Sequence, residues 1–258
     1  MQEILTHFEN GICTLTLNRP NVFNSFNRTM ALQLQAELDR CSSDESVRVV
    51  VLTGEGKAFC AGQDLAEATD PNGPELQRIV GEHYNPIILK LRAIEKPVIA
   101  AVNGVAAGAG ANIALACDIV LAKESAAFIQ AFSKIGLIPD SGGTFMLPRL
   151  VGLQKAMALM MTGEKVNASA AEKMNMIYKA IPDDDFAEYL QQFALQIAQM
   201  PTKGLGLTKK ALNAAYSNDL TSQLALEEKL QTEAGQTHDF KEGVSAFLEK
   251  RKPTFKGK

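Results

Sequence analysis

The sequence predicts an α/β fold over roughly its first 150 residues, followed by an all-helical C-terminal part. Two observations carry this prediction. Short apolar runs, tight Gly/Ala turns and helical segments alternate up to about residue 150, which is typical of a sheet covered by helices. Beyond that point apolar residues recur at helical spacing, and Pro182, Pro201 and Gly235 interrupt them. With 258 residues, of which 46% are hydrophobic, the chain can bury a sizeable core.

The individual elements follow from local patterns. Residues 2–17 are expected to form two strands around a turn at 9–11. Helices are expected from about Asn27 and from about Glu75, because apolar residues recur there every three or four positions. Their predicted inner faces are Met30, Leu34, Leu38 and Cys41 for the first helix, and Val80, Ile87, Ile88 and Leu91 for the second. Other segments are assigned by composition: buried strands at 47–52, 97–102 and 118–122, a mobile loop at 69–74, a turn at 103–110 and an Ala-rich helix at 111–117.

Composition narrows the class of protein. The net charge is −3 and no long basic run precedes the last dozen residues, which argues against nucleic acid as the main partner. Neither a secretory signal nor a membrane-spanning apolar run is recognised, and the four cysteines follow no zinc pattern, so we expect a cytoplasmic protein with reduced thiols and no metal site. The basic tail at 250–258 is either a solvated end or a small anion site. His7, His83 and His238 are interpreted as surface residues.

Asp140 is the first candidate for chemistry. It lies between apolar Ile138-Pro139 and a Ser-Gly-Gly turn. A carboxylate in apolar surroundings has a raised pKa and is a candidate general base or acid. Asp before Ser-Gly-Gly is also a good turn or helix N-cap residue, so both interpretations stay open at this point.

Two small-residue segments follow predicted strands, at 60–64 and 107–110. Small residues let a ligand approach the main chain, and free N–H groups at such turns can hold an oxyanion. Close packing of a helix on a sheet explains the same composition. Three other kinds of site are disfavoured. A dinucleotide-binding site is disfavoured because Ile113 stands where its fingerprint needs the third glycine, and a P-loop because Ala58 stands where it needs Ser or Thr. A serine-hydrolase site is disfavoured because Ser141 has no G-x-S-x-G frame.

Taken together, the segments at 17–24, 59–65, 96–118, 136–152 and 242–251 resemble the enoyl-CoA hydratase/isomerase (crotonase) family in order and spacing. The resemblance covers essentially the whole chain. It implies a spiral core of ββα units over 1–195 and a C-terminal helical trimerisation region over 196–258. It further implies trimers that often pair into hexamers, and an acyl-CoA substrate with no other cofactor.

The resemblance also implies residue roles. The backbone N–H groups of Gln63 and Ala109 would form an oxyanion hole, with Ala109 at a place where family members often have Gly. Phe247 and Lys250, from a neighbouring subunit, would cover the nucleotide. The remaining residues expected to bind coenzyme A are Asn21, Val22, Asn24, Ala61, Gln63, Asp64 and Leu65.

Departures from the family pattern concern the reaction. Hydratases of the family carry glutamates where this chain has Asn112 and Phe132. Asp140 occupies a place where several family isomerases carry their catalytic aspartate. The segment 132–144 is most similar to the isomerases of phenylacetate degradation, which convert ring-1,2-epoxyphenylacetyl-CoA to oxepin-CoA. An acyl-CoA isomerase is therefore expected; an enoyl-CoA hydratase of β-oxidation and a non-catalytic acyl-CoA- or RNA-binding homologue are the alternatives.

Overall fold

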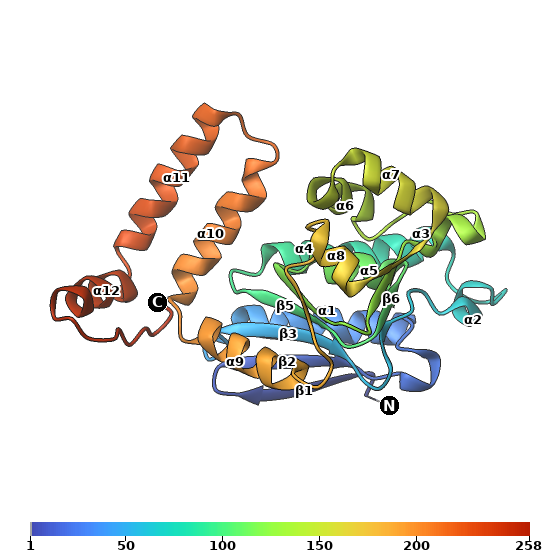
Figure 1. Ribbon diagram of the computed structural model, residues 1–258, viewed down its shortest axis with the longest axis horizontal. Coiled ribbons are helices and arrows are strands. Elements are labelled where there is room, and N and C mark those ends of the chain that lie inside the picture. The colour runs from blue at the N-terminus through green and yellow to red at the C-terminus, as the bar shows by residue number, and fades with distance from the viewer. Residues whose placement is uncertain (1) are drawn as a thin grey trace.

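The computed structural model describes residues 2–258 and contains two sheets with helices around them (Figure 1). The six-stranded sheet has the order β1-β2-β3-β5-β7-β10 and the four-stranded sheet the order β4-β6-β8-β9. Only the outer pairs β1/β2 and β8/β9 are antiparallel. The strands of the larger sheet are β1 Ile4–Glu9, β2 Ile12–Leu17, β3 Val49–Gly54, β5 Val98–Val102, β7 Ile119–Lys123 and β10 Lys179–Ile181. Those of the smaller sheet are β4 Ala58–Cys60, β6 Val105–Ala107, β8 Ala127–Ile129 and β9 Lys165–Asn167.

From β3 to β8, successive strands alternate between the two sheets, and a helical segment completes each turn of the chain. β3, β5 and β7 enter the larger sheet, and each is followed at once by β4, β6 or β8 in the smaller sheet. This is the ββα spiral that the family resemblance implies. The local patterns predicted the long strands but assigned 103–110 as a plain turn, whereas Val105–Ala107 forms β6. A three-residue strand is too short to show a period of two.

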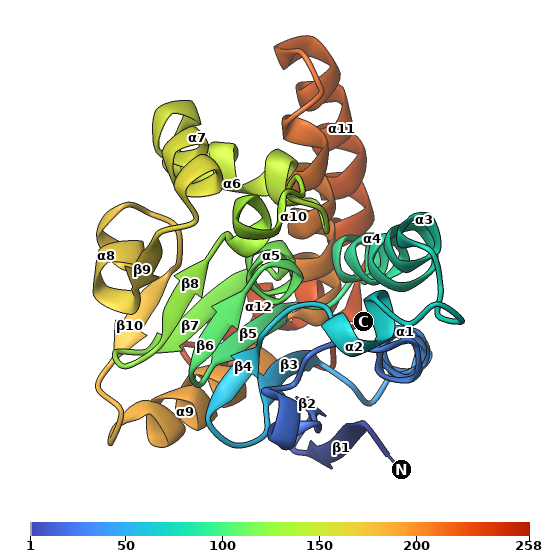
Figure 2. The same cartoon turned by 90° about the vertical axis from the view of Figure 1, so that its right-hand side faces the viewer.

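The core has two compartments, one on each face of the larger sheet. Side chains along a strand point alternately to its two faces. Val50 and Leu52 of β3 belong to the cluster shared with the smaller sheet and most helices, whereas Val49 and Val51 pack with α9 (Phe186–Ala198). Figure 2 shows α9 on the opposite side of this sheet from α5.

The first long helix, α1 (Arg28–Ser43), forms as predicted. The Asn27 side chain accepts a hydrogen bond from the Met30 N–H at 2.8 Å, which caps the helix N-terminus. All four residues of the predicted inner face are buried. The helix predicted from Glu75 differs, since it is divided into α3 (Leu76–Arg78), a π-helical segment η2 (Ile79–Tyr84) and α4 (Asn85–Ala93).

The remaining helical segments lie between strands or follow the sheets. They are η1 Pro20–Val22, α2 Leu65–Ala68, α5 Ala109–Ala116, η3 Ala131–Ile135, α6 Gly143–Val151, α7 Leu153–Thr162, α8 Ala168–Lys173, α10 Thr202–Ala215, α11 Leu220–Gly235 and α12 His238–Leu248. None of the helices within residues 2–258 is long and apolar enough to cross a bilayer.

The last three helices, α10, α11 and α12, extend away from the α/β body as an arm (Figure 1). α10 is anchored on the body by buried Lys209, whose Nζ lies 2.8 Å from Asp118 Oδ2. Several large apolar side chains of the arm are exposed, including Leu220 at 74% and Phe247 at 82%. The predicted boundary at 195/196 lies inside α9, which packs on the body and runs to Ala198.

Candidate active site

The segment after β4 is fixed by a short backbone pairing that leaves one N–H free. The Phe26 N–H donates to Gly62 O at 2.7 Å, and the Asp64 N–H donates to Phe26 O at 2.8 Å. In such a parallel bridge the residue between the two bonded ones directs its own backbone groups to the other side. The N–H of Gln63 therefore points away from Phe26. Within residues 2–258 it donates to no other group.

A second free donor stands at the start of α5. Gly108 adopts φ +52° and ψ −126°, a conformation that favours glycine, and its N–H donates to Ile129 O at 2.9 Å. Ala109 is then the first helical residue, so its N–H has no intrahelical partner, and none of the other described residues accepts from it.

The two donors belong to segments in close contact. A Cβ added to Gly62 would lie 3.0 Å from Ala107 O and 3.5 Å from Ala109 N. A Cβ added to Gly110 would lie 2.4 Å from Cys60 O. The small residues therefore serve close packing of α5 on β4, and the same packing brings both free N–H groups together. The structure confirms close packing as one interpretation of this composition, and the oxyanion-hole interpretation stays a prediction.

Asp140 is tied to the same helix. The side chain of Asn112, one turn beyond Ala109 on α5, donates to Asp140 O at 2.8 Å and accepts from Gln130 Nε2 at 2.8 Å. Asn112 is fully buried. A Cβ added to Gly143 would lie only 2.3 Å from Asn112 Nδ2, so a larger residue there would push the amide away. One turn of α5 thus supplies a free backbone N–H and a hydrogen bond that holds the backbone of Asp140.

The carboxyl group of Asp140 is partly buried, and burial raises its pKa above the ordinary range, against a smaller lowering by the Ser141 hydroxyl, which donates to Oδ1 at 2.9 Å. The direction agrees with the sequence prediction, but the expected cause was wrong in part, since Ile138 is 81% exposed. The N-cap interpretation is also wrong. The N-cap of α6 is Gly142, and Asp140 shapes the turn through its carbonyl, which accepts from Gly143 N at 2.9 Å.

Aromatic side chains surround these groups. Phe132 is buried, and its Cζ would lie 3.9 Å from a Cβ placed on Gly108. Tyr84 is 1% exposed, and its hydroxyl donates to Gln63 Oε1 at 2.8 Å. Burial, together with carboxylates that include Asp140, raises the pKa of Tyr84, so it remains a neutral phenol. Sequence patterns did not identify Tyr84 as a site residue, because a lone Tyr on a helix has no distinctive signal.

His83 corrects an expectation, since it is fully buried rather than on the surface. Its Nε2 lies 3.3 Å from Arg28 Nη1, and burial lowers its pKa. The polar sequence around it, Gly81-Glu82, points outward on the π-helical segment while His83 points inward.

The residues expected to bind coenzyme A divide into two groups on the main body. Asn21, Val22, Ala61 and Leu65 are exposed on neighbouring loops, and Asp64 pairs with Arg19 at 2.8 Å while capping α2. The exposed members are accessible to a ligand.

Asn24 differs, because its side chain is fully buried and cannot border a ligand in this conformation. Its Oδ1 accepts from Arg19 N at 2.9 Å, and its Nδ2 donates to Glu55 O and Ala58 O at 2.9 and 2.8 Å. This corrects the expected contact, since Asn24 instead holds the loop that presents Asn21 and Val22.

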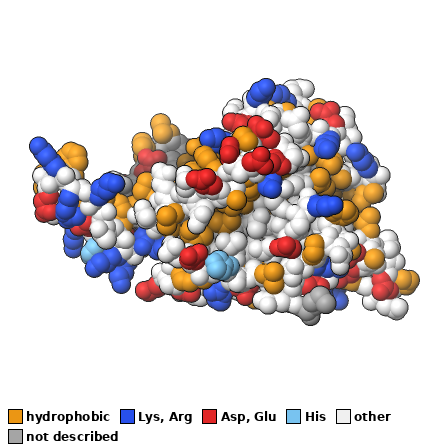
Figure 3. All heavy atoms as spheres, turned by 60° about the horizontal axis from the view of Figure 1, so that its bottom comes forward, with side chains coloured by type: hydrophobic (Ala, Val, Ile, Leu, Met, Phe, Trp, Pro, Cys, Tyr) orange, Lys and Arg blue, Asp and Glu red, His pale blue; other side chains and the backbone are white. Residues whose placement is uncertain are grey.

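Phe247 and Lys250 lie at the far end of the arm, away from the donors and Asp140 of the same chain (Figure 1). Basic side chains gather at this end, as the space-filling view shows (Figure 3). Arg251 is held by Glu242 and Glu249, both at 2.6 Å. Lys250 is exposed and has a positive φ of 56°.

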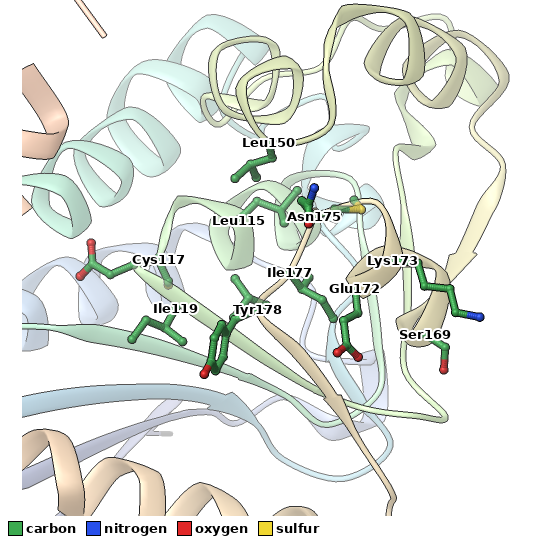
Figure 4. A pocket seen from close by; sticks show the side chains of 13 residues that line it. Leu115, Cys117, Ile119, Leu150, Ser169, Glu172, Lys173, Asn175, Ile177 and Tyr178 are labelled. Atoms are coloured by element: carbon green, nitrogen blue, oxygen red, sulfur yellow. The ribbon is translucent and has the colours of Figure 1, made fainter. Parts of the chain in front are cut away.

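A separate cavity of about 790 Å³ opens between the end of α5, β7 and α8 (Figure 4). Leu115, Glu172 and Tyr178 are among its lining residues. It contains none of the predicted site residues. We therefore place the candidate active site at the two backbone donors and Asp140.

Fold and site together define a class of protein: an α/β spiral with two adjacent free backbone donors and one carboxylate of raised pKa. A sequence family described as enoyl-CoA hydratase/isomerase matches residues 7–258. The chain belongs to this enzyme family.

Relatives of the chain carry both isomerase and hydratase names. It is 50% identical to the 1,2-epoxyphenylacetyl-CoA isomerase of Escherichia coli K12, over 100% of both chains. It is 48% identical to a probable enoyl-CoA hydratase of Rhodobacter capsulatus, over 96% of this chain and 95% of that one. It is 37% identical to the 2,3-dehydroadipyl-CoA hydratase of E. coli, over 100% of both.

Solved structures confirm the crotonase fold. A putative enoyl-CoA hydratase/isomerase from Mycobacterium abscessus superposes with a TM-score of 0.92 at 34% identity, covering 99% of this chain and 100% of that one. An enoyl-CoA hydratase from Bacillus anthracis gives 0.92 at 32% identity, covering 100% of both.

Proposed function

We propose that this protein is an acyl-CoA isomerase with Asp140 as its acid–base residue and the N–H groups of Gln63 and Ala109 as its oxyanion hole. The proposal rests on one observation: two residues in the same turn of α5 serve both groups. Ala109 supplies a free backbone N–H, and Asn112 donates a hydrogen bond to Asp140. The preferred reaction is conversion of ring-1,2-epoxyphenylacetyl-CoA to oxepin-CoA in phenylacetate catabolism. The name of the E. coli relative at 50% identity supports this substrate class. The shift of a 3-enoyl-CoA to a 2-enoyl-CoA is the open-chain version of the same chemistry.

The oxyanion hole acts on the thioester carbonyl. When a proton leaves the carbon α to the thioester, negative charge develops on the carbonyl oxygen as an enolate. Two preorganised N–H donors stabilise that charge more than they stabilise the neutral carbonyl, and removal of one such donor typically raises the barrier by about 3 kcal/mol. The positive end of α5 adds to the same effect, since Ala109 is its first residue.

Asp140 moves the proton. In its ionised form it removes the proton from the α carbon and becomes a neutral acid. It then returns the proton to the γ carbon of the enolate, so that the double bond moves and no atom is gained or lost. A raised pKa suits both half-steps, because a base that is too weak accepts no proton and an acid that is too weak releases none. With a ring epoxide, the same polarisation and proton transfer assist the ring expansion.

The residues at the hydratase positions favour isomerisation. Hydration requires carboxylates that orient and deprotonate water, whereas Asn112 and Phe132 do not titrate. Both are buried, and the amide of Asn112 donates to Asp140 O and accepts from Gln130 Nε2. The phenyl ring of Phe132 adds apolar surface next to the turn at Gly108 and helps to exclude water.

Coenzyme A enters with the substrate, and the scheme uses no other cofactor. The exposed residues of the η1 and α2 loops, Asn21, Val22, Ala61 and Leu65, are available to its adenine and pantetheine parts. The apolar surface of the arm supports assembly into a trimer or hexamer, because exposed Phe247 would be buried there. In such an assembly Phe247 and Lys250 would cover the nucleotide of a neighbouring site.

The test is Asp140→Asn, assayed with 3-enoyl-CoA and with ring-1,2-epoxyphenylacetyl-CoA. Loss of the base is expected to lower kcat by roughly 10²–10⁴-fold. Asp184→Asn, the same change at an exposed residue, is the matched control and should leave kcat unchanged. Turnover of Asp140→Asn close to that of the control would refute the proposed role.

Two further assays address the alternatives. Addition of water to crotonyl-CoA at a rate similar to isomerisation would identify a hydratase instead. A salt-sensitive gel shift with RNA, without turnover of any acyl-CoA, would identify a binding homologue.

A further inference from the structure

The side chain of Gln63, whose N–H is one proposed oxyanion donor, is held at both ends of its amide. Its Oε1 accepts from the Tyr84 hydroxyl at 2.8 Å, and its Nε2 donates to Glu67 Oε2 at 3.0 Å. Glu67 is itself fixed, since its Oε1 accepts from Arg28 N at 2.9 Å, at the first turn of α1. The amide therefore has little freedom to rotate, and the peptide group that carries the donor is restrained with it.

Tyr84 acts on this segment in a second way. Its ring packs edge-on against the ring of Phe26 with centroids 5.8 Å apart, and both side chains are inaccessible or nearly so. Phe26 is the residue whose backbone holds Gly62 and Asp64 on either side of the donor. One tyrosine thus contacts the side chain of Gln63 and also the residue that orients its peptide.

The position of Tyr84 depends on the π-helical segment. Each residue turns an α-helix by about 100°, so the extra residue of a π turn redirects every side chain that follows it. Tyr84 is the last residue of η2 (Ile79–Tyr84), and α4 begins immediately after it. π turns are an irregularity found frequently at functional sites. Here the irregularity directs a hydroxyl into the network of the oxyanion segment.

We propose that Tyr84 is a positioning residue of the oxyanion hole: its hydroxyl fixes Gln63, and so sets the direction of the Gln63 N–H toward the thioester oxygen. This inference rests on the proposed function only in requiring that a coenzyme A thioester binds at this site. It does not require Asp140 to transfer a proton. A purely structural role would reside in the ring, which Tyr84→Phe retains, whereas the positioning role resides in the hydroxyl.

The test uses cinnamoyl-CoA, a conjugated thioester that this isomerisation cannot convert. Its absorption moves to longer wavelength when its carbonyl accepts stronger hydrogen bonds, so the shift on binding reports the oxyanion hole without turnover. Tyr84→Phe is expected to reduce that shift while the Kd changes less than twofold. With an isomerisable enoyl-CoA, kcat is expected to fall roughly fivefold to tenfold with little change in KM, as for the loss of one hydrogen bond.

A second variant approaches the same contact from the other side. Gln63→Met keeps the backbone N–H and the length of the side chain but cannot accept the phenol hydrogen bond. It should reduce the wavelength shift at least as much as Tyr84→Phe, because it also removes the bond from Nε2 to Glu67, and the double variant should show no larger loss than Gln63→Met alone. Tyr178→Phe, at a residue that is 59% exposed, is the control and should match the wild type. If Tyr84→Phe fails to fold, the wavelength shift measured with Gln63→Met alone tests the inference.

An unchanged wavelength shift in Gln63→Met or Tyr84→Phe would overturn the inference, and so would losses that multiply in the double variant. The two proposals fail separately. Normal turnover in Asp140→Asn with a reduced shift in Tyr84→Phe would remove the acid–base role and leave the positioning role. Lost turnover in Asp140→Asn with an unchanged shift in Tyr84→Phe would do the reverse.

Discussion

Asn112 offers the sharpest stability test of the site. The sequence alone leads us to expect that Asn112→Asp matters less than loss of Asp140, if Asn112 only packs or positions substrate. The structure gives it a larger role, because its Nδ2 is a buried donor to Asp140 O at 2.8 Å. In Asn112→Asp an ionised carboxylate oxygen faces that carbonyl, and the shape of the side chain is nearly unchanged. Gln130 can still donate to the other oxygen.

The expected loss has two bounds. The Asp140 carbonyl keeps its hydrogen bond from the Gly143 N–H but loses the one from Asn112, and this loss destabilises the fold by about 1 kcal/mol. The new carboxyl can instead take up a proton and donate to that carbonyl. Protonating a carboxyl whose ordinary pKa is about 3.9 costs about 1.36 kcal/mol for each unit by which the pH exceeds that pKa. At pH 7 that is 3.1 units, or about 4 kcal/mol, which is the upper bound. At pH 5 the same product is only about 1.5 kcal/mol.

The sign follows from a folded-state pKa raised by burial. The penalty is complete above the folded pKa of the new carboxyl and disappears below its unfolded pKa, so acidification should restore stability to the variant relative to the wild type. The assay is urea unfolding of both proteins at pH 7 and pH 5, at one fixed protein concentration so that any self-association contributes equally to both.

Asn167→Asp is the matched control. It makes the same chemical change at the exposed N-cap of α8, where Asp caps as well as Asn. Its effect should be close to zero at both pH values. The reasoning fails if Asn112→Asp is as stable as the wild type at pH 7, or if its loss is the same at pH 5.

Three further outcomes are expected. Gly108→Ala should lower kcat, because φ +52° is unfavourable for alanine and the Ala109 N–H moves when the turn relaxes. Unfolding should stay nearly cooperative, because the new Cβ has ordinary space. Kinetics and calorimetry on one sample check both results. Lys209→Met should destabilise by somewhat less than the about 3–5 kcal/mol typical of a broken buried pair, since Asp118 keeps a second partner; urea titration measures it. Asp140→Asn should be more stable than wild type at pH 7 and equal to it below about pH 4, and wild-type kcat should rise with pH through a pKa above the usual Asp value. Equal stability of this variant at all pH values would contradict the burial of the charge.

Local sequence patterns predicted those parts of the fold that carry a long repeat. The pattern predicts four of the five buried residues of α1 and omits only Ala31, because sixteen residues show several periods of 3.6. β4, β6 and β8 have three residues each, and only their partners in the smaller sheet make them strands. The π turn before α4 has no signature in the apolar pattern, since the spacing of Val80, Ile87 and Leu91 also fits an unbroken helix.

The residues of the candidate site can be picked out in the sequence, but the hydrogen bonds that orient them cannot. Asp140 and the two small-residue turns are visible in the sequence. The bonds that orient them join positions far apart, such as Asn112 with Asp140, 28 residues apart, and Tyr84 with Gln63, 21 residues apart. No window of neighbouring residues contains such a pair. Burial of Asp140 likewise comes from the fold rather than from Ile138 beside it in the sequence.

The two proposed oxyanion donors are main-chain groups, and this has a consequence for how the site responds to mutation. Every amino acid except proline carries the same N–H, so a systematic replacement of Ala109 by other small residues would reveal almost nothing of its importance. Proline, or an ester in place of the amide, is the replacement that removes the donor itself. In the proposed mechanism, replacing side chains would therefore not detect most of the groups that polarise the thioester, whereas it would detect the single carboxylate that transfers the proton.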